Sequence, residues 1–172
     1  ISLGLVGSEM CIRDSIGSPS MNFVYATVKT SSKGASLTFG EDEIFVKDAP
    51  ESLKDYEGKE IVLGIRPEAF EDSVYANKKE FSEEININVS LLEQLGSDTY
   101  IHFYKDINPV QTEAIEEILA DEGEDISVLG TQTKFIARIN PNATIEEGKN
   151  INLAINPSKL HYFNPETGLA IN

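Results

Sequence analysis

EGKEIVLGIRPEAF, residues 57–70, returns at residues 147–160 as EGKNINLAINPSKL, and the two copies share seven of fourteen positions. Each copy opens on a Glu-Gly-Lys triplet, in which we expect the glycine to take the positive φ of a hairpin turn. Three apolar residues then stand at alternate positions, so a strand would point them at one core. The proline that follows has no N–H to give to a sheet, so the strand should end there. The stretch predicts a structural turn-and-strand module that is used twice.

The repeat extends upstream of this module. Phe45-Val46 falls on Phe135-Ile136 at the same spacing of 90 residues, whereas Asn22-Phe23-Val24 falls on Asn86-Ile87-Asn88 at a spacing of 64. A tandem duplication whose second copy carries an insert accounts for both spacings. Neither copy is long enough to bury a sizeable core alone, so the copies should pack together or interleave their strands.

The predicted boundaries follow from this duplication. Repeat one covers about residues 22–80, repeat two covers about residues 84–172, and the insert covers about residues 106–130. The insert holds eight acidic residues and no basic residue, as a solvated face often does.

The insert carries the signals of one helix. Asn108 can cap its start, Pro109 suits its first position, and Gly123 can end it. An apolar stripe at helical spacing is formed by Val110, Ala114, Ile115, Ile118 and Leu119. We expect this stripe to pack on the rest of the domain, the alternative being a groove for a partner.

Outside the insert the pattern is that of β-structure. Residues 85–91 alternate apolar and polar side chains without error, as a half-buried strand does. Further strands are expected at residues 23–28, 36–39, 43–46, 60–65, 99–104, 134–139, 150–155 and 160–163. Many short strands separated by turn residues indicate an all-β barrel or sandwich.

Composition excludes several classes of function. The 172 residues hold 29 acids against 14 bases, a net charge of −15, which disfavours nucleic acid and anionic membrane surfaces as partners. No run approaches the roughly 18 apolar residues of a membrane span. One cysteine, Cys11, excludes an internal disulfide framework and a multi-cysteine zinc site, and it suggests a reducing compartment.

Motifs of catalysis are missing. The sequence has no phosphate-binding loop, no nucleophile elbow and no zinc or EF-hand motif. His102 and His161 each stand between apolar residues of a predicted strand, so we interpret both as strand-face residues. The acidic run at residues 121–125 lacks the ligand spacing of a calcium loop. We therefore predict no catalytic, cofactor-binding or metal-ligating residue in this chain.

One place stands out as a candidate interaction site. Only the first copy of the module carries charges around its proline, as Arg66-Pro67-Glu68. A rigid strand end with charges of both signs suits contact with a partner, and the alternative is a local ion pair worth about 0–1 kcal/mol.

The first fifteen residues do not share these patterns. Ile1–Ser15 has no basic region before its apolar run, so it fails as a secretory signal. It resembles spurious translated sequence at the ends of environmental gene fragments, so we interpret it as a non-native leader, dispensable for folding, before a domain at residues 16–172. An ordinary frayed terminus is the alternative, and no base is available to activate Cys11.

Several short motifs occur in the order found in one family. They are residues 16–23 (IGSPSMNF), 64–68 (GIRPE), 95–100 (LGSDTY), 135–138 (FIAR) and 160–171 (LHYFNPETGLAI). Together they resemble the C-terminal regulatory domain of ATP-binding subunits of bacterial ABC sugar importers. Many relatives carry His where this chain has Ala69, so a contact made by that His is not expected here.

The resemblance implies an oligonucleotide/oligosaccharide-binding (OB)-like barrel, of the kind called TOBE or MOP-like, which pairs two ATP-binding subunits and receives regulatory input. ATP, Mg²⁺ and the catalytic residues would belong to a nucleotide-binding domain outside this sequence, so the chain itself would not be an enzyme. The implied partners are a second ATP-binding subunit and membrane permease subunits. The implied location is cytoplasmic, peripheral at the inner face of the membrane.

Two other classes of function stay open. Related barrels bind oxyanions such as molybdate, although a net charge of −15 opposes anion capture unless backbone donors override it. A barrel that binds nucleic acid would need a basic groove with stacking aromatic residues, whereas this sequence offers acidic loops.

Overall fold

The computed structural model of the chain describes residues 11–12, 19–112, 115 and 130–172. Within them, short helices of the 3-10 type separate antiparallel strands. The helices are η2 (Glu51–Tyr56), η3 (Pro67–Ala69) and η4 (Pro157–Lys159). The strands are β1 (Asn22–Ser31), β2 (Gly34–Phe39), β3 (Asp42–Val46), β4 (Glu60–Ile65), β5 (Phe70–Asp72), β6 (Glu83–Asn88), β7 (Leu91–Leu95), β8 (Asp98–Lys105), β9 (Thr133–Ile139), β10 (Asn150–Ile155) and β11 (Leu160–Phe163).

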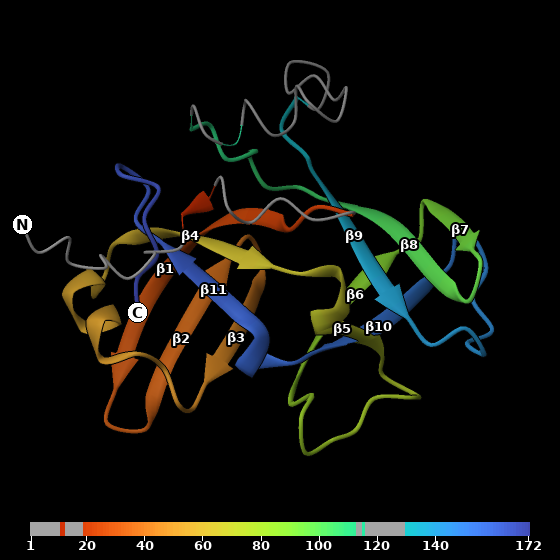
Figure 1. The fold of residues 1–172 in the computed structure, drawn as a ribbon, viewed down its shortest axis with the longest axis horizontal. Coiled ribbons are helices and arrows are strands. Elements are labelled where there is room, and N and C mark those ends of the chain that lie inside the picture. Colours follow the sequence, from red (N-terminus) through yellow and green to blue (C-terminus); the bar gives the residue numbers. More distant parts are fainter. Residues whose placement is uncertain (1–10, 13–18, 113–114, 116–129) are drawn as a thin grey trace, which may run out of the picture.

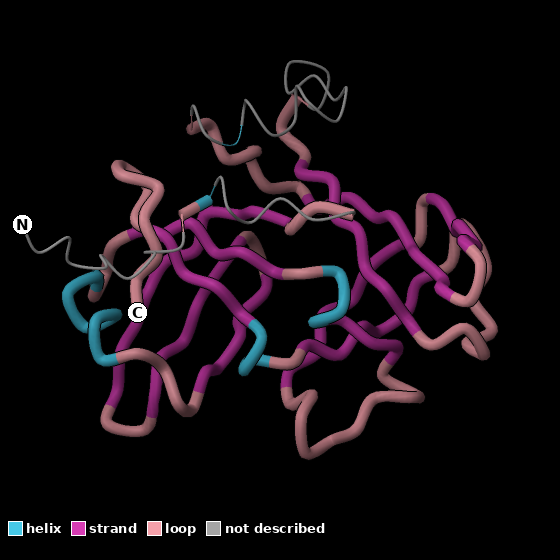
Figure 2. The backbone as a smooth tube through the Cα atoms, in the orientation of Figure 1, coloured by secondary structure: helices cyan, strands magenta, loops and turns pink. Residues whose placement is uncertain are grey.

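These strands form three sheets, so the predicted all-β class is confirmed. A five-stranded sheet has the order β11-β4-β1-β2-β3, and two three-stranded sheets have the orders β5-β10-β6 and β7-β8-β9. Figure 1 shows the five-stranded sheet on the left of the molecule and the two smaller sheets on the right. The tube in Figure 2 shows that η3 and η4 lie where these two parts meet.

The Glu-Gly-Lys triplets have the predicted positive φ but are not hairpin turns. Gly58 and Gly148 have φ values of 70° and 77°. Each triplet instead bonds to both backbone groups of a valine in a distant strand. Val28 N–H donates to Lys59 O at 3.0 Å, and Val28 O accepts from Gly58 N–H at 2.8 Å. Val89 makes the same two bonds with Lys149 and Gly148, at 3.0 and 2.7 Å. Each triplet thus brings its own strand beside a strand that comes much earlier in the chain.

The two copies of the module interleave. β5 follows η3 in the first copy but pairs with β10 of the second, whereas β11 follows η4 in the second copy but pairs with β4 of the first. Asn22 pairs with Ile65, and Glu83 pairs with Ile155, which is the equivalent of Ile65 in the second copy. Asn22 therefore corresponds to Glu83, three positions away from the predicted alignment. The duplication itself stays a prediction, and the exchange of strands ties the two parts together.

One core cluster joins the sheets. Phe103 of β8 stacks on Phe135 of β9 with ring centroids 5.2 Å apart, and it meets Phe70 of β5 edge to face at 6.0 Å. Apolar residues of the five-stranded sheet, such as Leu37 and Leu63, are fully buried in the same cluster. The core is therefore shared across the strands of both copies.

The structure corrects the predicted start of the helix in the insert. Residues 108–112 are not helical, so a helix does not start at Asn108, and Ile115 N–H donates to Thr112 O at 3.0 Å. Val110 and Ile115 are buried in a second apolar cluster with Phe163, and the rest of the predicted helix lies outside the described residues.

The two described residues of the leader contact the C-terminal segment of the chain. Cys11 forms an antiparallel bridge with Leu169, and Ile12 N–H donates to Gly168 O at 3.0 Å. Ile12 is fully buried in the second apolar cluster. Cys11 and Ile12 thus contact the domain, while the foreign origin of the leader and its dispensability for folding stay predictions.

Candidate functional site

The end of β4 builds the first half of the candidate site. β4 is buried from Ile61 to Ile65, and a side chain at Gly64 would collide with Sδ of Met21 and crowd the ring of Phe163. Pro67 then turns the chain into η3, whose last residue donates from its N–H to Arg66 O at 2.9 Å. The turn is therefore rigid, because it is packed below and hydrogen-bonded within.

The matching turn after β10 faces it. Asn156 occupies the place of Arg66, is buried, and accepts from Ser158 N–H at 3.0 Å and Ser158 Oγ–H at 2.6 Å. Its own N–H donates to Ala69 O at 2.9 Å, and Lys159 Nζ donates to Glu68 O at 3.4 Å. The two turns are thus hydrogen-bonded to each other, and the first carries Arg66 and Glu68 beside the contact while the second carries Lys159.

The three predicted interaction residues differ in their access to solvent. Pro67 is buried and serves the turn, whereas Arg66 and Glu68 are half-buried. Within the described part of the chain, the guanidinium of Arg66 forms no hydrogen bond or ion pair, so the predicted alternative of a local ion pair is not formed. Arg66 and Glu68 therefore stay available for contact.

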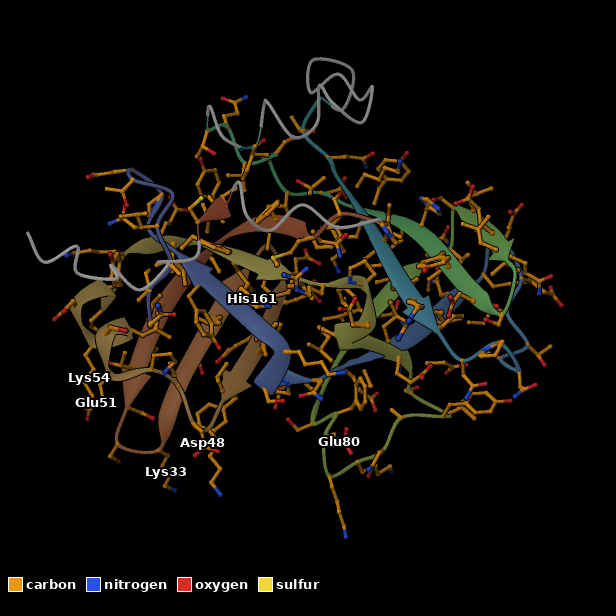
Figure 3. All side chains as sticks on the ribbon, viewed as in Figure 1. Lys33, Asp48, Glu51, Lys54, Glu80 and His161 are labelled. Atoms are coloured by element: carbon orange, nitrogen blue, oxygen red, sulfur yellow. The ribbon has the colours of Figure 1, made fainter. Side chains whose placement is uncertain are left out.

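The structure brings His161 to these charges. Burial lowers the pKa of His161 below its ordinary value of 6.5, the nearby Arg66 lowers it further, and Glu68 opposes both by raising it. His161 lies on β11 opposite Gly64 and stacks on Phe163 with ring centroids 6.5 Å apart. Figure 3 labels His161 on β11 near the centre of the molecule. The sequence placed this residue on a strand face but gave no sign that it neighbours Arg66.

A groove of about 830 Å³ borders the same region. Its walls are the end of β3, residues 79–83 before β6, the segment from Asn156 to Tyr162, and residues 170–172. Burial raises the pKa of Tyr162 on this wall to about 12, so its hydroxyl stays protonated. Sequence reasoning missed this groove, because its walls come from four separate segments that share no motif.

The described residues show no candidate metal site. They contain no group of three or more His, Cys, Asp or Glu side chains that could hold a metal ion. His102, the other histidine, points its Nε2 at Glu93 Oε2 across 2.5 Å and leaves its Nδ1 buried without a partner. No helix among the same residues is long and apolar enough to cross a membrane. The acidic run at residues 121–125 lies outside the described residues.

Comparison with known proteins gives a family model and several relatives. The family model of the MalK OB fold domain matches residues 17–70, which run from the approach to β1 to the end of η3 and Phe70. The trehalose import ATP-binding protein SugC of Mycobacterium tuberculosis is 28% identical over 155 residues, which cover 89% of this chain and 38% of that protein. The oligosaccharides import ATP-binding protein MsmX of Bacillus subtilis is 29% identical over 161 residues, which cover 91% of this chain and 36% of that protein.

A third relative gives the same result. The multiple sugar-binding transport ATP-binding protein MsmK of Streptococcus mutans is 28% identical over 160 residues, 91% of this chain and 35% of that protein. The chain thus spans little more than a third of the length of these relatives. Among solved structures, the molybdate-bound cytoplasmic protein ModG is 13% identical with a TM-score of 0.49 over 84% of this chain and 96% of that one, a likeness too low to support any conclusion. Residues 17–70 therefore match the MalK OB fold domain, and the chain is similar over most of its length to part of ATP-binding proteins that serve sugar import, as its motifs predicted.

Proposed function

We propose that this chain is a regulatory and subunit-pairing domain of an ATP-binding subunit that energises carbohydrate import. The observation that carries the proposal is the match to the MalK OB fold domain, which ends at the rigid turn with Arg66 and Glu68. The relatives named above import trehalose, oligosaccharides or several sugars, so a carbohydrate is the proposed cargo.

The proposed division of labour leaves ATP chemistry outside this chain. Neither Glu-Gly-Lys triplet is suited to bind a phosphate, because acidic residues precede each glycine. The glycine N–H groups are also occupied, since they donate to the backbone oxygens of Val28 and Val89. ATP, Mg²⁺ and the residues that act on them would belong to the part of the relatives that this chain does not match. Its partners would be a second ATP-binding subunit and membrane permease subunits, at the cytoplasmic face of the membrane.

Arg66 is the residue proposed to make the contact. Arginine often dominates interface energies, because its planar guanidinium directs several hydrogen bonds at once. Here Arg66 is half-buried, and its guanidinium has no partner among the described residues. The residue lies at the start of the rigid turn η3. A partner carboxylate or carbonyl would therefore meet a donor whose backbone is already fixed, so that only the side chain has to be ordered on binding.

Sedimentation velocity of the chain and of Arg66→Ala tests this proposal. We expect the parent to self-associate, or to dock on an ATP-binding subunit of the same family, and the variant to do so more weakly by about tenfold or more. The melting temperature should change little, since an exposed charge contributes about 0–1 kcal/mol.

Arg138→Ala is the matched control. Its side chain is 48% exposed and faces Asp98 across 3.7 Å, so its charge has a partner where that of Arg66 has none among the described residues. Equal association of parent and Arg66→Ala, or an equal loss in both variants, would refute the contact role of Arg66. A parent that never associates with itself or with an ATP-binding subunit would refute subunit pairing.

The oxyanion alternative has less support, because the relatives named above are sugar importers. Calorimetric titration with molybdate and sulfate should give no saturable heat.

A further inference from the structure

The groove described above is bordered by the five-stranded sheet. β3 and β11 are the two end strands of that sheet, and both line the groove. Figure 3 labels Asp48, Glu80 and His161, which come from three of its four wall segments. Its volume of about 830 Å³ falls within the 300–1,000 Å³ typical of sites for small molecules.

The charges around the groove nearly cancel. Lys47 and Lys79 stand against Asp48, Glu80 and Glu83, a formal balance of −1 in a chain of net charge −15. An anion would meet three carboxylates, one more than the number of lysines, and a cation would meet two lysines. The groove therefore favours an uncharged ligand over either ion.

The remaining lining offers neutral hydrogen-bonding groups. The lowered pKa of His161 keeps its imidazole uncharged at neutral pH, with one N–H donor and one N acceptor. The hydroxyls of Ser82 and Tyr162 add groups that both donate and accept. No hydrogen bond of these three side chains to another described residue is present.

An aromatic wall completes the set. Phe45 of β3 lines the groove and is 36% exposed, although its neighbours Ile44 and Val46 are buried. An exposed ring of this kind provides a flat apolar surface for the C–H face of a sugar ring. Neutral polar groups beside an aromatic face suit a ligand that carries many hydroxyls on an apolar ring.

We propose that this groove binds a small uncharged carbohydrate. The choice of a sugar among neutral polyols rests on the proposed function, whereas the preference for an uncharged ligand rests on the groove alone. His161 lies in the groove wall and within electrostatic reach of Arg66 and Glu68. A ligand in the groove would thus change the electrostatic environment of the turn that is proposed to contact a partner.

Titration of the chain with maltose and trehalose, followed by NMR and calorimetry, tests the proposal. We expect saturable binding with a dissociation constant of about 1 mM or lower. The imidazole resonances of His161 should shift with the sugar, and those of His102, which does not line the groove, should not. Molybdate and trehalose 6-phosphate should bind at least about tenfold more weakly.

Phe45→Ala should weaken the binding of both sugars by about tenfold. Tyr104→Ala is the matched control, because Tyr104 is an exposed aromatic residue of β8 outside the groove, and it should bind as the parent does. No saturation up to about 10 mM sugar, tighter binding of molybdate, or an equal loss in both variants would overturn the proposal. The shift of His161 in the unmodified chain decides the case even if Phe45→Ala fails to fold.

The two proposals fail separately. Sugar binding by a chain that never associates would leave the groove proposal standing and refute subunit pairing. Association without sugar binding would refute the groove proposal alone.

Discussion

At the scale of single residues, the charge on His161 depends on two neighbours of opposite sign. Arg66 lowers the pKa of its imidazole and Glu68 raises it, on top of the larger effect of burial. We expect Arg66→Ala to raise the pKa of His161 and Glu68→Gln to lower it further. NMR titration of the imidazole resonances of His161 measures both changes. Shifts of equal sign in the two variants would show that the turn rearranges instead.

The same histidine gives a sign to the pH dependence of stability. Because its folded pKa lies below its ordinary value of 6.5, the unfolded chain binds the proton more readily. The contribution of His161 to stability is therefore fully present above about pH 6.5 and is lost as the pH falls through its folded pKa. The sequence identified the residue but could not predict this behaviour, since the burial and both charges come from tertiary contacts.

At the scale of elements, Asn22 fastens β1 to β9. Its Nδ2 donates to Ile65 O at 2.7 Å and Ile136 O at 2.9 Å, and its Oδ1 accepts from Ile136 N–H at 2.6 Å. Asn22→Ala would leave buried backbone groups without partners, so we expect a loss of about 2–3 kcal/mol in the free energy of unfolding. Urea denaturation measures it. Asn86→Ala removes an exposed asparagine of β6 and should cost less than about 1 kcal/mol; equal costs would contradict the fastening role.

Ile12 is the leader residue that we expect to stabilise the fold. This side chain is fully buried against Met21 and Phe163, so Ile12→Ala should cost about 2–4 kcal/mol and lower the melting temperature by roughly 5–10 °C. A chain lacking residues 1–10 is the control and should melt as the parent does. Calorimetry compares the three proteins. An unchanged melting temperature for Ile12→Ala would support the expectation that all of Ile1–Ser15 is dispensable.

Elements were predictable where the chain itself marks their ends. β4 and β10 begin after a Glu-Gly-Lys triplet and end before a proline, and both were predicted with their observed bounds. The predicted strand at residues 85–91 ran too far, because the chain changes partner there: Val89 bonds to Lys149, and Ser90 N–H donates to His102 O at 2.8 Å. β5 and β7 were missed, since three residues are too few for a pattern and LLEQL does not alternate.

At the scale of the whole molecule, the site is a product of strand exchange. The order of the strands brings η3 against η4 and sets β3 opposite β11 across the groove. The motif at residues 66–68 was visible in the sequence because its residue types are local. The groove was not, because pairing partners about a hundred residues apart decide which side chains meet.

Strand exchange also predicts that neither half of the chain folds alone. Without residues 83–172 the five-stranded sheet loses β11, which pairs with β4 from Val62 to Ile65, and β1 loses the bonds of Asn22 to Ile136. Without residues 19–82 the sheet β5-β10-β6 loses β5, and Phe103 loses its contact with Phe70. We therefore expect each half to give a poorly dispersed amide NMR spectrum, because each exposes apolar surface that the other covers. Refolding the two halves together should restore the amide dispersion of the parent chain. A half that shows a dispersed spectrum by itself would mean that the exchanged strands add to a domain already stable without them.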